Sequence, residues 1–289
     1  MNASGEKHHI FNHELKLRVI SGLILAALVL SMTWIGGLTF TLLWAVAAFA
    51  IFYEFTRICK TNIEQTKVFA GYGFILLTMS AWIFENQALA YQIFLVAVVL
   101  NLFWERVSQQ PHWVSLGVAY ALLPFFAMSE LRDAGDLGLF FIFLLFACVW
   151  GADILAYFFG KGIGGPKLAP RISPKKTWSG FIGGILGAVG LCFVVTKFFG
   201  FSFTSNLMLL TVLLAIFSQV GDLMESLLKR LFDVKDSGNL IPGHGGVLDR
   251  IDGLIVAGVT LWGVMKLMQI QDGSDITLSE LFRRVILMP

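Results

Sequence analysis

Long apolar runs separated by short polar segments dominate the chain. A helix needs about 20 mainly apolar residues to cross the hydrocarbon core of a bilayer, and nine runs approach that length. They are roughly Leu17–Ile35, Thr39–Tyr53, Val68–Phe84, Ala88–Trp104, Trp113–Met128, Leu137–Phe159, Phe181–Phe199, Leu207–Leu228 and Leu254–Ile270. The pattern predicts an all-α polytopic membrane protein with about nine transmembrane helices.

No internal repeat or low-complexity linker interrupts these runs, which indicates one membrane domain. The first run has no small-residue cleavage site after it, so we expect it to be retained as a span. We divide the chain into a polar N-terminal arm (1–16), N-terminal transmembrane helices (17–135), helices and loops with the candidate chemistry (136–270) and a C-terminal tail (271–289).

Composition agrees with a membrane protein. Hydrophobic residues make up 57% of the chain and charged residues 14%, against roughly 45–50% and about 25% in a soluble domain. The net charge of +2 is too small to indicate a nucleic-acid partner. The three cysteines are far apart in apolar surroundings, which fits reduced thiols better than a disulfide frame or a zinc site.

Lys and Arg residues between the runs predict the orientation, because cytoplasmic loops carry the excess of these residues. With the N-terminus inside, 16 of them fall in inside segments and 4 in outside segments. The two richest inside loops are 160–180 and 229–253. We therefore expect a polar cavity that faces the cytoplasm at this end of the helices.

The densest polar stretch extends from Ser226 to Gly253. It contains, in order, Ser226, Lys229-Arg230, Lys235-Asp236, His244-Gly-Gly and Asp249-Arg-x-Asp252. In this order and spacing these residues resemble the signature of the phosphatidate cytidylyltransferase family. Two upstream segments, Asp153–Gly160 and Ser173–Thr177, resemble the other polar blocks of that family. The resemblance covers about residues 150–253, whereas the first five runs match only in character.

The resemblance implies transfer of a cytidylyl group from CTP to phosphatidic acid, giving CDP-diacylglycerol and pyrophosphate. It implies Mg²⁺ as cofactor, leaves a second cation and a homodimer open, and places the protein among membrane lipids in a bacterial inner membrane. Catalytic roles fall to Asp222, Ser226, Lys229, Arg230, Lys235, Asp236, His244, Asp249 and Arg250. Substrate-binding roles fall to Asp153, Tyr157, Ser173, Lys175, Lys176, Thr177, Gly245, Gly246 and Asp252.

The residues themselves also indicate a charged site on the eighth run. If that run stays helical to its end, polar residues at steps of three or four share one face: Gln219, Asp222, Ser226, Lys229 and Arg230. An ionisable side chain within hydrocarbon costs on the order of 2.5–3.5 kcal/mol, so Asp222 and Glu225 need a partner or a water-filled cavity. The alternative is that both are solvated charges at the helix end.

Carboxylates in this region suit a hard divalent cation. Mg²⁺ is bound by a few carboxylates together with phosphate and water, and Asp222, Asp249 and Asp252 supply such groups. The resemblance makes Asp222 and Asp249 the metal ligands. For Asp252, a structural salt bridge to Arg250 is an equal alternative.

The glycines on either side of His244 leave room for the backbone to approach a phosphate chain, although a turn after Pro242 explains them as well. An ionised phosphate nucleophile needs no deprotonation of a hydroxyl. We therefore expect His244 to orient phosphate or metal-bound water and not to act as a general base.

Basic side chains are needed because the two substrates bring together about six negative charges. Six residues could supply them, although some are explained as topology signals: Lys167, Arg171, Lys175, Lys176, Lys229 and Arg230. Ser179 departs from the family pattern, in which we expect an acid two positions after Thr177. Asp153, Tyr157 and Lys161 share one side of the sixth run, as ligands or as a structural polar seam.

Three other functions use some of the same features. A CTP-dependent polyprenol-type lipid kinase is the main alternative, and the labelled product separates it from cytidylyl transfer. A CDP-alcohol phosphotransferase would need Ala-Arg and two further aspartates after the Asp249–Gly253 segment, which Leu254–Thr260 does not supply. A transporter would place charges near the membrane centre, whereas these lie at helix ends and in loops.

Overall fold

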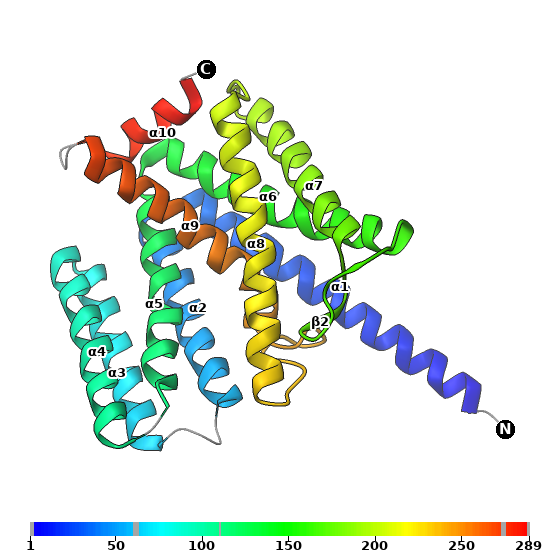
Figure 1. Ribbon diagram of the computed structural model, residues 1–289, viewed down its shortest axis with the longest axis horizontal. Coiled ribbons are helices and arrows are strands. Elements are labelled where there is room, and N and C mark those ends of the chain that lie inside the picture. Colours follow the sequence, from blue (N-terminus) through cyan, green and yellow to red (C-terminus); the bar gives the residue numbers. More distant parts are fainter. Residues whose placement is uncertain (1–2, 60–63, 110, 273–275, 288–289) are drawn as a thin grey trace.

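The computed structural model describes residues 3–59, 64–109, 111–272 and 276–287, with side chains for 19–271 and 276–286 within these ranges. Its helices are α1 (Ala3–Ile35), α2 (Gly37–Ile58), α3 (Gln65–Ile83), α4 (Gln87–Val107), α5 (Trp113–Arg132), α6 (Gly135–Gly162), α7 (Trp178–Phe198), α8 (Ser205–Leu231), α9 (Leu248–Asp272) and α10 (Leu278–Leu287) (Figure 1).

The nine apolar runs correspond in chain order to α1–α9, which confirms the all-α polytopic prediction. Helices α2–α9 are each long and apolar enough to cross a membrane, and the described apolar part of α1 is Val19–Ile35. Helix α1 begins at Ala3, well before the predicted start at Leu17. A helix of 20 residues is about 30 Å long, which matches the hydrocarbon core.

Two elements were not predicted. Strands β1 (Lys167–Ala169) and β2 (Ser173–Thr177) form an antiparallel hairpin between α6 and α7. The predicted C-terminal tail contains α10, whose Phe282 stacks on Phe141 of α6 with ring centroids 3.8 Å apart. Both elements are shorter than a membrane span, so a search for long apolar runs passes over them.

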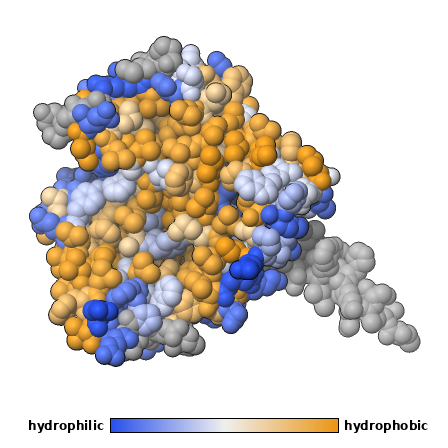
Figure 2. Space-filling view, in the orientation of Figure 1, coloured by the Kyte–Doolittle hydropathy of each residue, from blue (hydrophilic) through white to orange (hydrophobic). Residues whose placement is uncertain are grey.

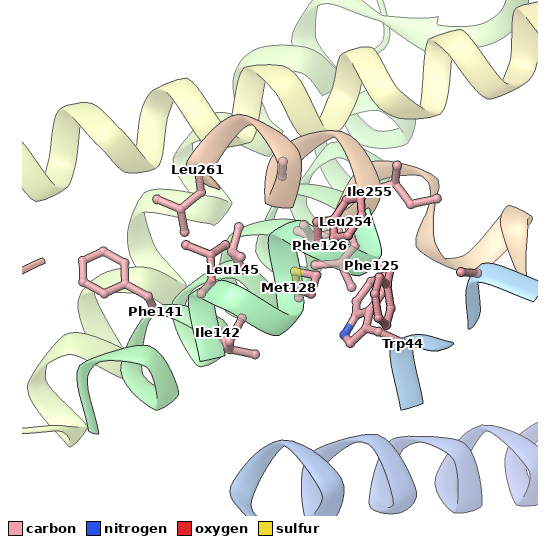
Figure 3. Packing of buried hydrophobic residues seen from close by; sticks show 14 of the residues in the cluster. Trp44, Phe125, Phe126, Met128, Phe141, Ile142, Leu145, Leu254, Ile255 and Leu261 are labelled. Atoms are coloured by element: carbon pink, nitrogen blue, oxygen red, sulfur yellow. The ribbon is translucent and has the colours of Figure 1, made fainter. Parts of the chain in front are cut away.

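The core lies around α5 and α6, which have the largest buried shares among the candidate spans. Figure 3 shows α5, α6 and α9 meeting there, through Phe125, Phe126, Met128, Ile142, Leu145, Leu254, Ile255 and Leu261. All of these side chains are buried. Because lipid is as apolar as leucine, close packing between helices holds this core together more than exclusion of water does.

Helices α6 and α7 approach each other closely along a glycine contact. A Cβ atom on Gly187 would lie 2.2 Å from the carbonyl oxygen of Gly151, so only glycine fits there. This agrees with the small-residue spacing of α7, which is typical of helix packing in membranes. The contact fixes the direction in which α7 leaves the β-hairpin.

The outer surface is mostly apolar. Figure 2 shows hydrophobic residues across the middle of one face, with hydrophilic residues mostly near its edges. Large apolar side chains such as Phe84, Phe198 and Leu209 are more than two-thirds exposed. An apolar exterior of this extent fits contact with lipid chains, and the protein is an integral, multi-pass membrane protein.

Candidate active site

Two polar segments that are far apart in the sequence meet at one end of the helices. This end, here called the hairpin end, is where α6 and α8 finish and where α7 and α9 begin. Figure 1 shows β2 and the first turns of α9 beside the lower part of α8, and ion pairs join these elements. The charged residues predicted from the sequence therefore come together in space.

Lys229 links α8 to α9 through two carboxylates. Its Nζ lies 2.5 Å from Oε2 of Glu225 on the same helix and 2.8 Å from Oδ1 of Asp249 at the start of α9. Glu225 is buried, and its second oxygen has no hydrogen-bond partner among the described residues. Glu225 is thus buried and paired with Lys229, and it is not the solvated group at the helix end that the alternative expected.

Asp249 also holds the loop that precedes α9. Its Oδ2 accepts hydrogen bonds from the backbone N–H groups of Ser237 and Gly246, each at 3.1 Å. Both carboxylate oxygens are therefore engaged with protein donors, since Oδ1 faces Lys229. In this arrangement Asp249 organises the loop around residues 237–247.

Glu54 of α2 accepts hydrogen bonds from the same loop. This residue was not identified from the sequence. Its side chain is completely buried. Its Oε1 accepts from the N–H of Val247 at 2.9 Å, and its Oε2 accepts from Leu248 N–H at 2.8 Å and Ser237 Oγ at 3.0 Å. Because Leu248 begins α9, the carboxylate satisfies free N–H groups at a helix N-terminus. An acid directly after the second apolar run was the available signal.

Close packing around Glu54 explains Gly246. A Cβ atom there would lie 1.9 Å from Ser237 Oγ and 2.6 Å from Glu54 Oε2. The N–H of Gly246 points to Asp249, so this glycine serves the loop itself. Gly245 has a φ of 82°, a conformation that glycine adopts at little cost. The turn explanation therefore accounts for both glycines.

A second charged group joins β2, α6, α8 and α9. Nζ of Lys176 lies 2.6 Å from Oδ2 of Asp222. Asp153 and Asp252 each interact electrostatically with both of these residues. Three carboxyl groups therefore lie around Lys176.

A polar cavity of about 260 Å³ adjoins this group. Its lining includes Asp153, Tyr157, Lys175, Lys176, Thr177 and Asp222. The Tyr157 hydroxyl also accepts a hydrogen bond from Lys161 at 3.2 Å. Six of the predicted residues thus line one hollow, although they come from α6, β2 and α8.

Thr177 and Ser179 shape the edge of this cavity. The Thr177 hydroxyl caps α7 by accepting from the N–H of Gly180 at 3.1 Å, and it lies 2.9 Å from the Ser179 hydroxyl. Ser179 donates in turn to the carbonyl of Gly164. Ser179, where an acid was expected, therefore ties the hairpin connection to the start of α7.

Arg250 of α9 contacts His244, which lies in the loop before that helix. Arg250 donates from Nε and Nη2 to the carbonyl of His244, at 3.1 and 2.7 Å. Nδ1 of His244 lies 3.0 Å from Ser21 Oγ of α1. Among the described residues no ion pair joins Arg250 to Asp252, so the structure does not form the salt bridge that was the alternative for Asp252.

Several predicted residues lie outside these contacts. Lys235, Asp236 and Arg230 are exposed, and Arg230 only reaches the carbonyl of Val234 at 3.4 Å. Ser173 pairs with Ala169 in the hairpin and does not line the polar cavity. Ser226 makes a long hydrogen bond of 3.4 Å to Asp222. The structure brings most of the predicted site residues together at the hairpin end, but not all of them.

The carboxylates at the hairpin end are the candidate ligands of Mg²⁺. Within the described ranges, no three His, Cys, Asp or Glu side chains are placed to hold a metal ion by themselves. Mg²⁺ in nucleotide sites is usually bound by one or two carboxylates, with phosphate oxygens and water completing the shell. The group of carboxyls around Asp222 fits such a site once substrate phosphates are present.

Comparisons with known proteins identify the family. Residues 16–268 match the model of the cytidylyltransferase family. A phosphatidate cytidylyltransferase of Brucella abortus is 41% identical over 248 residues, which cover 86% of this chain and 92% of the relative. The phosphatidate cytidylyltransferase of Bacillus subtilis is 34% identical, over 88% of this chain and 98% of the relative. The chain belongs to the cytidylyltransferase family.

Proposed function

We propose that this protein transfers the cytidylyl group of CTP to phosphatidic acid, giving CDP-diacylglycerol and pyrophosphate. The similarity to phosphatidate cytidylyltransferases over nearly their whole length supports this activity. The structural observation that carries it is the hairpin end, where Lys176 and Lys229 each pair with carboxylates of α8 or α9 beside a polar cavity.

The triphosphate of CTP fits the polar cavity next to the β-hairpin. Lys175 and Lys176 supply positive charge there, and Tyr157 supplies a hydroxyl. A phosphate oxygen of phosphatidic acid forms a new bond to the α-phosphorus, and the bond from that phosphorus to the bridging oxygen of pyrophosphate breaks. Fixed cations stabilise the charge that accumulates on the leaving group.

We place Mg²⁺ at Asp222, with Asp249 as the second candidate ligand. When bound, the ion would neutralise phosphate charge and orient the reacting groups. Asp222 pairs with Lys176 and accepts a long hydrogen bond from Ser226, and a lysine in that position can move to a phosphate. Asp249 would have to exchange its bonds to Lys229 or to the loop N–H groups.

We further propose that the protein lies in the bacterial inner membrane with the hairpin end facing the cytoplasm. The excess of Lys and Arg in the segments at this end supports that orientation. CTP is available in the cytoplasm, and phosphatidic acid is available in the bilayer. The active site then lies where both substrates reach it.

Incubation of the purified protein with α-labelled CTP, phosphatidic acid and Mg²⁺ tests the proposal. We expect the label to enter the lipid phase as CDP-diacylglycerol, with pyrophosphate released. A CTP-dependent lipid kinase would instead leave the α-label in soluble CDP. Absence of label in the lipid, with folded protein, would overturn the proposed activity.

A further inference from the structure

A second cavity, of about 300 Å³, lies beside the first turn of α9. Its walls come from α1, α6, α9 and the loop before α9. They are mostly apolar and include Leu25, Val29, Phe146, Trp150 and Leu254. Leu25 and Trp150 are 37% and 44% exposed, so the cavity adjoins the lipid-facing surface of the helices.

One end of this cavity is polar. His244 and Arg250 both line it. Arg250 uses two N–H groups on the carbonyl of His244, and no carboxylate forms an ion pair with it within the described part of the chain. A guanidinium has five N–H donors, so Arg250 retains donors for a phosphate.

Helix α6 lines both cavities, with Val149 and Trp150 at the apolar cavity and Asp153 and Tyr157 at the polar one. Successive helical residues are rotated by about 100°, so Asp249 and Asp252 share one side of the helix and Arg250 points away from it. Asp249 faces Lys229, and Asp252 lies close to Lys176 and Asp222. Arg250 therefore belongs to the same turn of α9 as the two aspartates that interact with the charged groups of α8 and β2.

We propose that the apolar cavity binds phosphatidic acid. Its phosphate monoester lies at Arg250 and His244, and the glycerol and first acyl carbons lie among the side chains of α1, α6 and α9. The cavity is too small for a whole diacyl lipid, so the rest of each chain continues into the bilayer past Leu25 and Trp150. This assignment rests on the proposed function and adds where the lipid binds.

Helix α1 connects the lipid site to the loop. Ser21 Oγ donates to the carbonyl of Pro242 at 3.1 Å and lies 3.0 Å from Nδ1 of His244. Three of the residues that follow Ser21 line the cavity, namely Gly22, Leu25 and Ala26. Helix α1 therefore lines the part of the cavity that takes the acyl chains. It also holds His244 at the polar end of the cavity, where the phosphate binds.

Neighbouring alanines on α1 provide a matched test. Ala26 lines the cavity, whereas Ala27 is exposed on the same helix and does not line it. Phe at position 26 would fill space that the lipid needs. We therefore expect Ala26→Phe to raise the KM for phosphatidic acid in mixed micelles about ten-fold. The KM for CTP should stay unchanged, and Ala27→Phe should match the wild type.

The outcomes separate the two proposals. If the wild-type protein makes no CDP-lipid, the proposed function fails. If it does and Ala26→Phe shows the same KM for phosphatidic acid as Ala27→Phe, the lipid site lies elsewhere. A rise in the KM for CTP as large as that for the lipid would also overturn the assignment.

Photo-crosslinking of the wild-type protein provides a test that does not depend on the variants. Phosphatidic acid with a diazirine on the second or third acyl carbon is irradiated with the protein, and the labelled peptides are identified by mass spectrometry. We expect labels in residues 22–29 and 146–150, and loss of these labels with excess unlabelled phosphatidic acid. Competable labelling confined to other helices would rule out this cavity.

Discussion

At the scale of single residues, Lys229 is the cation whose removal should have the largest effect. It stands between Glu225 and Asp249, so Lys229→Met leaves two carboxylates close together without a cation. Breaking a buried ion pair in this way costs about 3–5 kcal/mol. We expect a lower unfolding temperature in detergent together with loss of turnover.

The neighbouring residue gives the control for this prediction. Arg230 is exposed and makes only a long hydrogen bond to a carbonyl. Arg230→Met should therefore change the free energy of unfolding by less than about 0.5 kcal/mol. Equal unfolding temperatures for the two variants would contradict the pairing of Lys229 seen in the structure.

Glu54 is predicted to matter for turnover as well as for stability. Gln keeps one acceptor oxygen but places an N–H₂ group against a backbone N–H or the Ser237 hydroxyl, which costs about 1–3 kcal/mol. Because the affected groups belong to the loop that carries Asp249, we expect Glu54→Gln to lower kcat per folded molecule. Turnover and the folded fraction are measured on the same sample.

Glu105 offers a matched comparison, because it makes no contact with the loop before α9 among the hydrogen bonds of the described residues. It is also a buried glutamate, and it accepts from the N–H of Val114 at 2.8 Å and from the Ser115 hydroxyl at the start of α5. Glu105→Gln should cost similar stability and leave kcat per folded molecule near the wild-type value. If both variants lose kcat equally, Glu54 has no special role in positioning the loop.

At the scale of elements, the loop between α8 and α9 depends on one small residue. Gly246→Ala places a methyl group against Ser237 and Glu54, so the loop must shift and Asp249 must shift with it. We expect turnover to fall by at least ten-fold, because overpacking costs about 1–3 kcal/mol. A radiolabel assay on detergent-purified protein measures the loss.

A glycine within α9 provides the control for the loop glycine. A Cβ atom on Gly263 would meet nothing within 4 Å, and alanine is the better helix former by about 1 kcal/mol. Gly263→Ala should therefore keep full turnover and raise the unfolding temperature slightly. Full activity in Gly246→Ala would show that the loop tolerates displacement.

At the scale of the whole molecule, the native cysteines make the orientation testable. The three cysteines are all buried, so a membrane-impermeant maleimide should leave the wild-type protein unlabelled. Asp236→Cys places an exposed thiol at the hairpin end, and Glu85→Cys places one between α3 and α4. We expect labelling of position 236 only in inside-out vesicles and of position 85 only from outside intact spheroplasts. The reverse pattern would invert the proposed orientation.

The apolar runs predicted α1–α9 well, because span length and composition are local properties. The charged face of α8 was likewise predictable, since Asp222, Ser226 and Lys229 recur at helical steps. The partners were not, because pairing across the bundle depends on tertiary packing. Glu54 illustrates this: it lies 194 residues from Leu248, and no periodicity joins two residues so far apart.

The contact between Glu54 and the loop before α9 also has a consequence in time. Chains are synthesised at about 5–20 residues per second, and 193 residues separate Glu54 from Val247. For roughly 10–40 s at that rate the acid at the end of α2 exists before any of its three donors. The site is thus completed from a helix that is synthesised early and a loop that is synthesised late. A ribosome that stalls before residue 237 leaves a membrane-inserted chain in which the Glu54 carboxylate lacks all three of these hydrogen-bond donors.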